Sequence, residues 1–274
     1  MAGTLWLVGT PIGNLGDLTD RARETLAAAD VIAAEDTRRT GRLLSSIGLT
    51  DRAPMVSYFE GNERERTGEL VRRLQEGANV TLVTDGGMPG VSDPGYRLVR
   101  AAVDAGLDVR VVPGPSAVVA ALVLSGLATD RFAFEGFLPR KAGERRTRLE
   151  ALSADDRTLV LFESPRRVQA LLRDIVEVMG DRQVAVAREL TKLHEEVRRG
   201  RVSEVLAEMG EAPQKGEVVV VIEGLTQVPV PDMDGCVAEA KELVTGGMKK
   251  REAARVVANL RGVSANDLYR SLVG

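Results

Sequence analysis

The sequence predicts an α/β protein made of two sheet-containing domains and a short helical C-terminal segment. Short β-branched or apolar runs alternate with amphipathic segments along most of the chain, as in α/β folds. The 274 residues correspond to about two domains at about 150 residues each. A hydrophobic content of 44% is enough to fill a core in each domain. The near-average content of charged residues, glycine and proline argues against disordered, collagen-like and coiled-coil proteins.

The first domain is predicted over residues 1–116, with five strands that pair mostly in parallel because helices separate them. We expect these strands at residues 4–8, 31–34, 54–58, 80–84 and 108–112. Helices are expected at about 17–29, from Asn62 to about residue 76, and from Asp93 to Gly106. Asn62 with Glu65 matches a capping box, and Asp93 before Pro94 matches an N-cap followed by an N1 proline.

The second domain is predicted over residues 117–227, with strands at 131–134, 158–162, 183–187, 195–201 and 217–222. A helix should run from Ser116 to about Ser125, and another should be capped by Ser164-Pro165 and end near Met179. Residues 187–201 leave no room for a helix, so this sheet should be mixed. An extended linker at 228–231 precedes a basic segment of two or three helices over residues 232–274.

The residue counts restrict the chemistry. Cys236 and His194 are the only cysteine and histidine, which argues against disulfides, most zinc sites and Ser-His-Asp triads. We therefore expect no metal, and we expect His194 to lie on the surface. The N-terminus has no basic region before its apolar stretch, and the longest apolar run, 118–124, is far shorter than the roughly 20 residues of a membrane span. These features predict a cytoplasmic protein without a membrane partner.

Three glycine- and proline-rich loops, at residues 9–14, 85–95 and 113–116, follow predicted strands. Ligands bind at the carboxyl ends of parallel strands, and glycine lets the backbone approach them, so these loops predict a site for a nucleoside-like cofactor. The alternative is that they are ordinary tight turns. No G-x-G-x-x-G or P-loop motif is present, although Glu35 and Asp36 stand where a ribose-binding acid of a dinucleotide fold is expected.

The net charge of −3 is not that of a typical nucleic-acid-binding protein, but basic residues are concentrated in two places. Between Arg140 and Arg148 there are five basic residues and one acid, and between Gly246 and the C-terminus there are six basic residues and two acids. These patches are compatible with a polyanionic partner or with solvated helix faces.

Seven strings, taken in order along the chain, resemble those of one family. They are LWLVGTPIGNLGDLT at the N-terminus, AAEDTR (33–38), LVTDGGMPGVSDPG (82–95), VVPGPSA (111–117), EGFLPRK (135–141), FESPRR (162–167) and RELTKLHEE (188–196). The chain resembles the tetrapyrrole-methylase-fold family of S-adenosylmethionine-dependent methyltransferases. EDTR, FLPRK and FESPRR are similar to its group that acts on small-subunit ribosomal RNA.

The resemblance implies a homodimer that holds S-adenosylmethionine between its two α/β domains. It also implies methylation of the ribose 2′-hydroxyl of a cytidine in the decoding region of 16S ribosomal RNA, free or within the 30S particle. The implied cofactor-binding residues are Pro11, Gly86, Gly87, Met88, Val91, Ser116, Ala117, Glu163 and Leu190. Met88 departs from many tetrapyrrole-acting relatives, which carry an acid there.

A ribose hydroxyl is a poor nucleophile that benefits from a nearby base. We hypothesise that Asp36 is this base or orients the hydroxyl, with Glu35 and Glu189 as other carboxylates and His194 as a weaker option, and that Arg38 positions a phosphate. The alternative is that Glu35 and Asp36 cap the next helix.

The residues expected to bind RNA are Arg140, Lys141, Arg145, Arg146, Arg166, Arg167, Lys249, Lys250 and Arg251. Only nine residues are aromatic, which argues against an extended base-stacking surface and favours recognition of RNA shape. Two other functions stay open: a methyltransferase of this fold acting on a tetrapyrrole or a protein side chain, and a non-catalytic RNA-binding protein of ribosome assembly.

Overall fold

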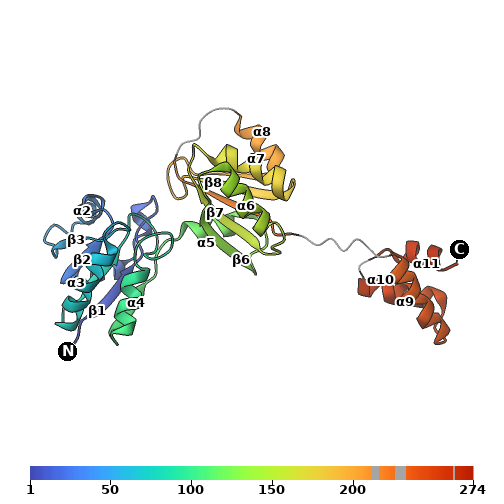
Figure 1. Cartoon of the computed structure of the whole chain (residues 1–274), viewed down its shortest axis with the longest axis horizontal. Helices are drawn as coiled ribbons and strands as arrows, with labels where there is room; N and C mark the ends of the chain where they lie inside the picture. Colours follow the sequence, from blue (N-terminus) through green and yellow to red (C-terminus); the bar gives the residue numbers. More distant parts are fainter. Residues whose placement is uncertain (211–215, 226–232, 262, 274) are drawn as a thin grey trace. The chain divides into compact units, whose positions relative to one another are not determined.

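The computed structural model describes residues 1–210, 216–225, 233–261 and 263–273, which belong to two compact units, Met1–Leu225 and Thr226–Gly274 (Figure 1). The larger unit contains two five-stranded sheets, one in each half of its sequence. We call residues 1–116 the first lobe and 117–225 the second lobe. The predicted α/β class is confirmed, and the predicted linker at 228–231 lies outside the described residues.

The first lobe contains a fully parallel sheet in the order β3-β2-β4-β1-β5. Its strands are β1 (Thr4–Val8), β2 (Val31–Ala34), β3 (Met55–Ser57), β4 (Val80–Val83) and β5 (Asp108–Val112). Its helices are η1 (Leu15–Asp17), α1 (Asp20–Ala27), α2 (Thr37–Ser46), α3 (Glu63–Gln75) and α4 (Tyr96–Asp104). Two hydrophobic clusters pack against the sheet, and β2 and β4 are buried along their whole length. Such continuous burial is expected of a parallel sheet covered on both faces.

The second lobe contains a mixed sheet in the order β6-β7-β10-β8-β9, in which only β6 and β7 are parallel. Its strands are β6 (Phe132–Phe137), β7 (Thr158–Glu163), β8 (Gln183–Arg188), β9 (Glu196–Arg201) and β10 (Val218–Ile222). Its helices are α5 (Ala117–Ser125), α6 (Ala142–Leu152), α7 (Val168–Met179) and α8 (Val202–Met209). Helix α5 belongs to one hydrophobic cluster, and α6, α7 and α8 belong to another. The predicted mixed sheet is confirmed.

Three helix caps differ from the prediction. Helix α4 has Gly95 as its N-cap, so Asp93 and Pro94 belong to the loop before it. Helix α7 follows Arg167, after a turn whose first residue, Ser164, accepts backbone hydrogen bonds through its carbonyl. Asn62 does precede α3, but its side-chain oxygen accepts from a backbone amide before the helix, so no capping box forms. In each case residue type and spacing match a helix cap, but they do not determine the residue at which the helix begins.

The smaller unit contains α9 (Met233–Thr245), α10 (Lys250–Arg261) and α11 (Ala265–Val273) around a small core that includes Cys236, Val257 and Leu268. No helix in the described part of the chain is long and apolar enough to cross a membrane.

Candidate functional site

A cavity of about 410 Å³ lies where the strands of the first lobe end, with second-lobe residues among its walls. We call it the strand-end cavity. Its volume falls in the range of small-molecule sites, about 300–1,000 Å³. Its lining includes Pro11, Gly86, Gly87, Met88, Val91, Ser116, Ala117 and Glu163, which are eight of the nine predicted cofactor residues. The ninth, Leu190, is instead buried in the hydrophobic cluster of α5.

Backbone groups of two glycine-rich loops are joined at this cavity. The Thr10 amide donates to the Gly87 carbonyl at 2.9 Å, and the Gly87 amide donates to the Thr10 carbonyl at 3.0 Å. Gly87 has a φ of +91°, a conformation that side chains with a Cβ disfavour. A Cβ at Gly9 would lie 2.7 Å from the Gly114 backbone, so the first and third loops also require close backbone approach. The cavity is therefore lined in part by fixed backbone groups.

Three carboxylates, Glu35, Asp85 and Asp93, also line the strand-end cavity. Glu35 Oε2 accepts a hydrogen bond from the Asp85 amide at 3.1 Å, and Asp85 pairs with Arg39 at 3.0 Å. Burial raises the pKa of Glu35 and of Asp85. Burial, reinforced by the charge of Glu35, raises the pKa of Asp93 to about 7. The carboxyl group of Asp93 can therefore take up or release a proton near neutral pH.

Asp36 and Arg38 do not line the strand-end cavity. Asp36 is the N-cap of α2, and its Oδ1 accepts from the Arg38 and Arg39 amides at 2.8 and 3.2 Å. These hydrogen bonds lower the pKa of Asp36, which makes it a weaker base. Arg38 pairs with Asp36 at 3.5 Å, and its side chain is 88% exposed. The structure thus gives Asp36 the capping role of the alternative interpretation, whereas Glu35 faces the cavity.

The other two candidate bases, Glu189 and His194, do not line the strand-end cavity. Glu189 pairs with Lys192 at 2.9 Å, and this hydrogen bond lowers the pKa of Glu189. His194 is exposed, as expected.

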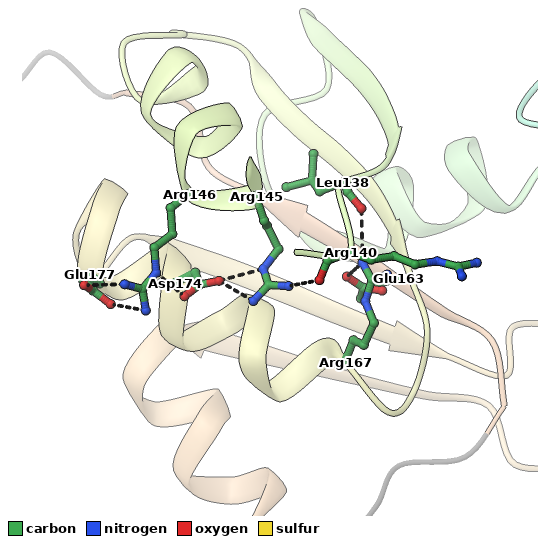
Figure 2. Close-up of polar contacts among 8 residues, drawn as sticks. All are labelled: Leu138, Arg140, Arg145, Arg146, Glu163, Arg167, Asp174 and Glu177. Atoms are coloured by element: carbon green, nitrogen blue, oxygen red, sulfur yellow. Dashed lines mark hydrogen bonds and ion pairs between the residues drawn. The ribbon is translucent and has the colours of Figure 1, made fainter. Parts of the chain in front are cut away.

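Two of the arginines expected to bind RNA are engaged by carboxylates of α7 (Figure 2). Arg145 Nε donates to Asp174 at 2.6 Å, and the two side chains are 6% and 4% exposed. Arg146 pairs with Asp174 and Glu177 at 2.8 and 2.9 Å. The guanidinium of Arg145, which we expected to bind RNA, is thus buried and neutralised in this conformation.

The remaining predicted RNA residues are more accessible. Arg167 is part-buried and donates to Glu163 at 2.8 Å and to the Leu138 carbonyl at 3.1 Å (Figure 2). Lys141 is exposed and pairs with Glu144. The other five predicted residues are exposed: Arg140, Arg166, Lys249, Lys250 and Arg251.

Sequence reasoning missed several residues of the cavity. Asp93 was assigned to a helix cap, and Asp85, Arg39, Phe137 and Phe162 were given no role, although all five line the cavity. The two aspartates lie at the ends of the second glycine-rich loop, which was the available signal. No group of His, Cys, Asp and Glu suited to hold a metal occurs among residues 1–210, 216–225, 233–261 and 263–273.

Comparisons with known proteins agree with this architecture. Residues 4–206 match the family described as Tetrapyrrole (Corrin/Porphyrin) Methylases. The chain is 45% identical to a Synechocystis protein named ribosomal RNA small subunit methyltransferase I, with 98% of this chain and 96% of that one covered. It is 43% identical to the Escherichia coli O157:H7 protein of the same name, with 98% and 94% covered.

Solved structures share the fold. The uroporphyrin-III-C-methyltransferase of Thermus thermophilus has a TM-score of 0.55 at 26% identity, with 80% of this chain and 94% of that one covered. The methyltransferase CobJ has a TM-score of 0.61 at 19% identity, with 82% and 95% covered. The chain therefore belongs to the tetrapyrrole methylase family and, within it, to the ribosomal RNA small subunit methyltransferase I group.

Proposed function

We propose that the protein transfers a methyl group from S-adenosylmethionine to the ribose 2′-hydroxyl of a cytidine in the decoding region of 16S ribosomal RNA. It acts as a homodimer in the cytoplasm, on the RNA or the 30S particle. The observation that carries this proposal is a strand-end cavity lined by glycine-rich loops and by the three carboxylates Glu35, Asp85 and Asp93. It occurs in a chain whose near-full-length relatives are named for small-subunit ribosomal RNA methylation.

The residues of the strand-end cavity suit this cofactor. The absence of side chains at Gly86 and Gly87 lets a ligand approach the backbone closely, and the carboxylates of Glu35, Asp85 and Asp93 favour a sulfonium cation electrostatically. A Thermus thermophilus uroporphyrin-III C-methyltransferase of the same fold, 22% identical, was solved with S-adenyl homocysteine. When bound, S-adenosylmethionine supplies an electrophilic methyl group. The chain's own residues must then orient the acceptor hydroxyl and remove its proton.

Asp93 is the best candidate for the proton acceptor. It lines the cavity, and its pKa of about 7 matches a base that works near neutral pH. Glu35 assists by keeping that pKa high, because its negative charge opposes ionisation of Asp93. Asp36 is less suitable, since its carboxylate already accepts two backbone hydrogen bonds.

The test combines cofactor titration with methyl transfer. Calorimetry should detect S-adenosylmethionine binding to the full chain, and labelled methyl should appear in the ribose of undermethylated small subunits. Asp93→Asn should lower kcat by about 100-fold, a larger change than in cofactor affinity. The control, Asp36→Asn, should keep turnover within a few-fold and change stability little, because asparagine caps helices about as well as aspartate.

Three outcomes would contradict the proposal. Full turnover by Asp93→Asn would remove its role as a base. Cofactor binding without transfer to RNA would favour a tetrapyrrole or protein side chain as the acceptor. Failure to bind the cofactor would leave only the RNA-binding alternative.

A further inference from the structure

A second cavity, of about 670 Å³, adjoins the strand-end cavity. It is lined by the end of β6 and the segment after it (Phe137, Leu138, Arg140) and by the end of β7 and the following turn (Glu163 to Arg167). Phe137, Glu163, Ser164 and Pro165 line both cavities. We call this second cavity the arginine groove. A molecule bound there lies next to whatever occupies the strand-end cavity.

Arg140 and Arg166 in this groove differ from the neighbouring arginines. Both are exposed, and the described residues provide neither guanidinium with an ion pair or hydrogen bond. Figure 2 shows the Arg140 side chain extending away from Arg145 and Asp174, while its backbone carbonyl accepts from Arg145 at 3.4 Å. Arg145 thus supports the loop, and the charge of Arg140 stays available to an anion.

Phe137 is the aromatic residue at the junction of the two cavities. It is 60% exposed, although its ring packs against Phe162 with centroids 5.6 Å apart and an interplanar angle of 60°. A large aromatic side chain left this exposed beside two free cations offers a stacking face for a planar group.

The walls of the groove are tied together by hydrogen bonds. Arg167 reaches from the turn before α7 to the Leu138 carbonyl and to Glu163, whose other oxygen accepts from the Ser164 amide at 2.6 Å. The Glu163 side chain is only 1% exposed. These contacts hold the segment of Phe137 and Arg140 against the segment of Arg166, so the groove exists before a substrate arrives.

We propose that the arginine groove holds the target nucleotide, with its base stacked on Phe137 and its flanking phosphates bound by Arg140 and Arg166. This assignment rests on the proposed function as an RNA methyltransferase. One stacking face and two cations match a single unstacked nucleotide of a polyanionic chain, as in enzymes that take a base out of its stack. Arg167 is a positioning residue, because its charge is directed at Glu163 and its role is to fix the groove.

The test measures labelled methyl transfer to undermethylated small subunits as kcat/KM, with S-adenosylmethionine affinity measured separately by calorimetry. Phe137→Leu should lower kcat/KM by about 10- to 100-fold, and Phe137→Trp should retain most of it. Arg140→Gln and Arg166→Gln should each raise KM by about tenfold and weaken its dependence on salt. Cofactor affinity should stay within about twofold in Arg140→Gln and Arg166→Gln, because these two arginines line the arginine groove but not the strand-end cavity.

Arg173→Gln is the matched control, since Arg173 is an exposed arginine of α7 outside both cavities. If the groove variants and this control have the same kcat/KM and the wild-type protein is active, the assignment of the nucleotide to the groove is overturned. The proposed methyltransferase function would stand. Loss of activity in Phe137→Trp as severe as in Phe137→Leu would overturn stacking. Wild-type protein that binds cofactor but does not methylate RNA would refute the proposed function, and the groove assignment with it.

Discussion

The two lobes of the large unit build their candidate sites in different ways. In the first lobe, glycine-rich loops bring backbone groups together, as in the paired hydrogen bonds between Thr10 and Gly87. In the second lobe, arginine side chains line the arginine groove. Neighbouring residues determine which arginines of this lobe are available to a ligand: Arg145 is buried against Asp174, whereas Arg140 is exposed. A loop motif thus marks a backbone site directly, but a cluster of arginines does not reveal which ones can meet a ligand.

The largest expected effect concerns the buried ion pair of the second lobe. Asp174→Ala should lower the free energy of unfolding by about 3–5 kcal/mol, because it leaves the buried Arg145 without a counter-charge. Urea denaturation of the full chain measures this loss. Asp156→Ala is the control: the Arg131–Asp156 pair is 63% and 58% exposed, and its loss should cost below about 1 kcal/mol. Similar costs for the two variants would mean that Arg145 is not structural.

The next effect concerns the backbone site of the first lobe. Gly87→Val should weaken S-adenosylmethionine binding by about 10- to 100-fold, because a β-branched residue at a φ of +91° strains the loop by about 1–3 kcal/mol. Calorimetric titration measures the affinity. Gly106→Val introduces comparable strain at a φ of +66° in a turn outside the cavity, and should lower stability without changing affinity. Unchanged affinity in Gly87→Val would argue against a backbone site.

A smaller effect should appear in the pH dependence of stability. Asp93 has a pKa of about 7 in the fold, above its usual value, so folded protein keeps a proton that unfolded protein releases. Its contribution is therefore present at low pH and is lost as pH rises toward and through 7. Asp93→Asn should lose less stability than wild type in urea titrations between about pH 5 and pH 8.

Asp36→Asn tests a carboxyl group whose pKa is shifted in the opposite direction to that of Asp93. The pKa of Asp36 is lowered by its backbone hydrogen bonds, so its contribution is present above the usual carboxyl range and is lost only in acid. The stability difference between this variant and wild type should stay constant over the same range. A parallel pH profile for Asp93→Asn and wild type would contradict the raised pKa of Asp93.

The smallest effect is expected in the C-terminal unit, where exposed cations surround the start of α10. Lys250→Gln should reduce the slope of log affinity for ribosomal RNA against log salt by about 0.7, the value for one phosphate contact on a single strand. Binding titrations at several salt concentrations measure the slope. Lys241→Gln on α9, also exposed, is the control and should leave the slope unchanged. Equal slopes for both variants would remove Lys250 from the RNA-binding surface.

Most of the fold was predictable because it depends on periodicity and spacing. The strands from β1 to β10 lie close to the predicted runs, and the short connection between β8 and β9 correctly indicated a mixed sheet. The helix starts were less predictable. Asp93 has the residue type and spacing of a cap but lies in the cavity wall, because a short polar side chain suits a cap and a binding loop equally well.

The sequence by itself determined the α/β class, the position of the glycine-rich loops and the family, because hydrophobic period, turn residues and motif strings are local properties of the chain. The tertiary structure alone decided which charged groups take part in a site. It placed Asp36 on a helix N-terminus, Asp93 in the cavity and Arg145 against Asp174. The physical reason is that burial and pairing depend on residues far apart in sequence, and these two factors set both the pKa of a carboxyl group and the availability of a guanidinium.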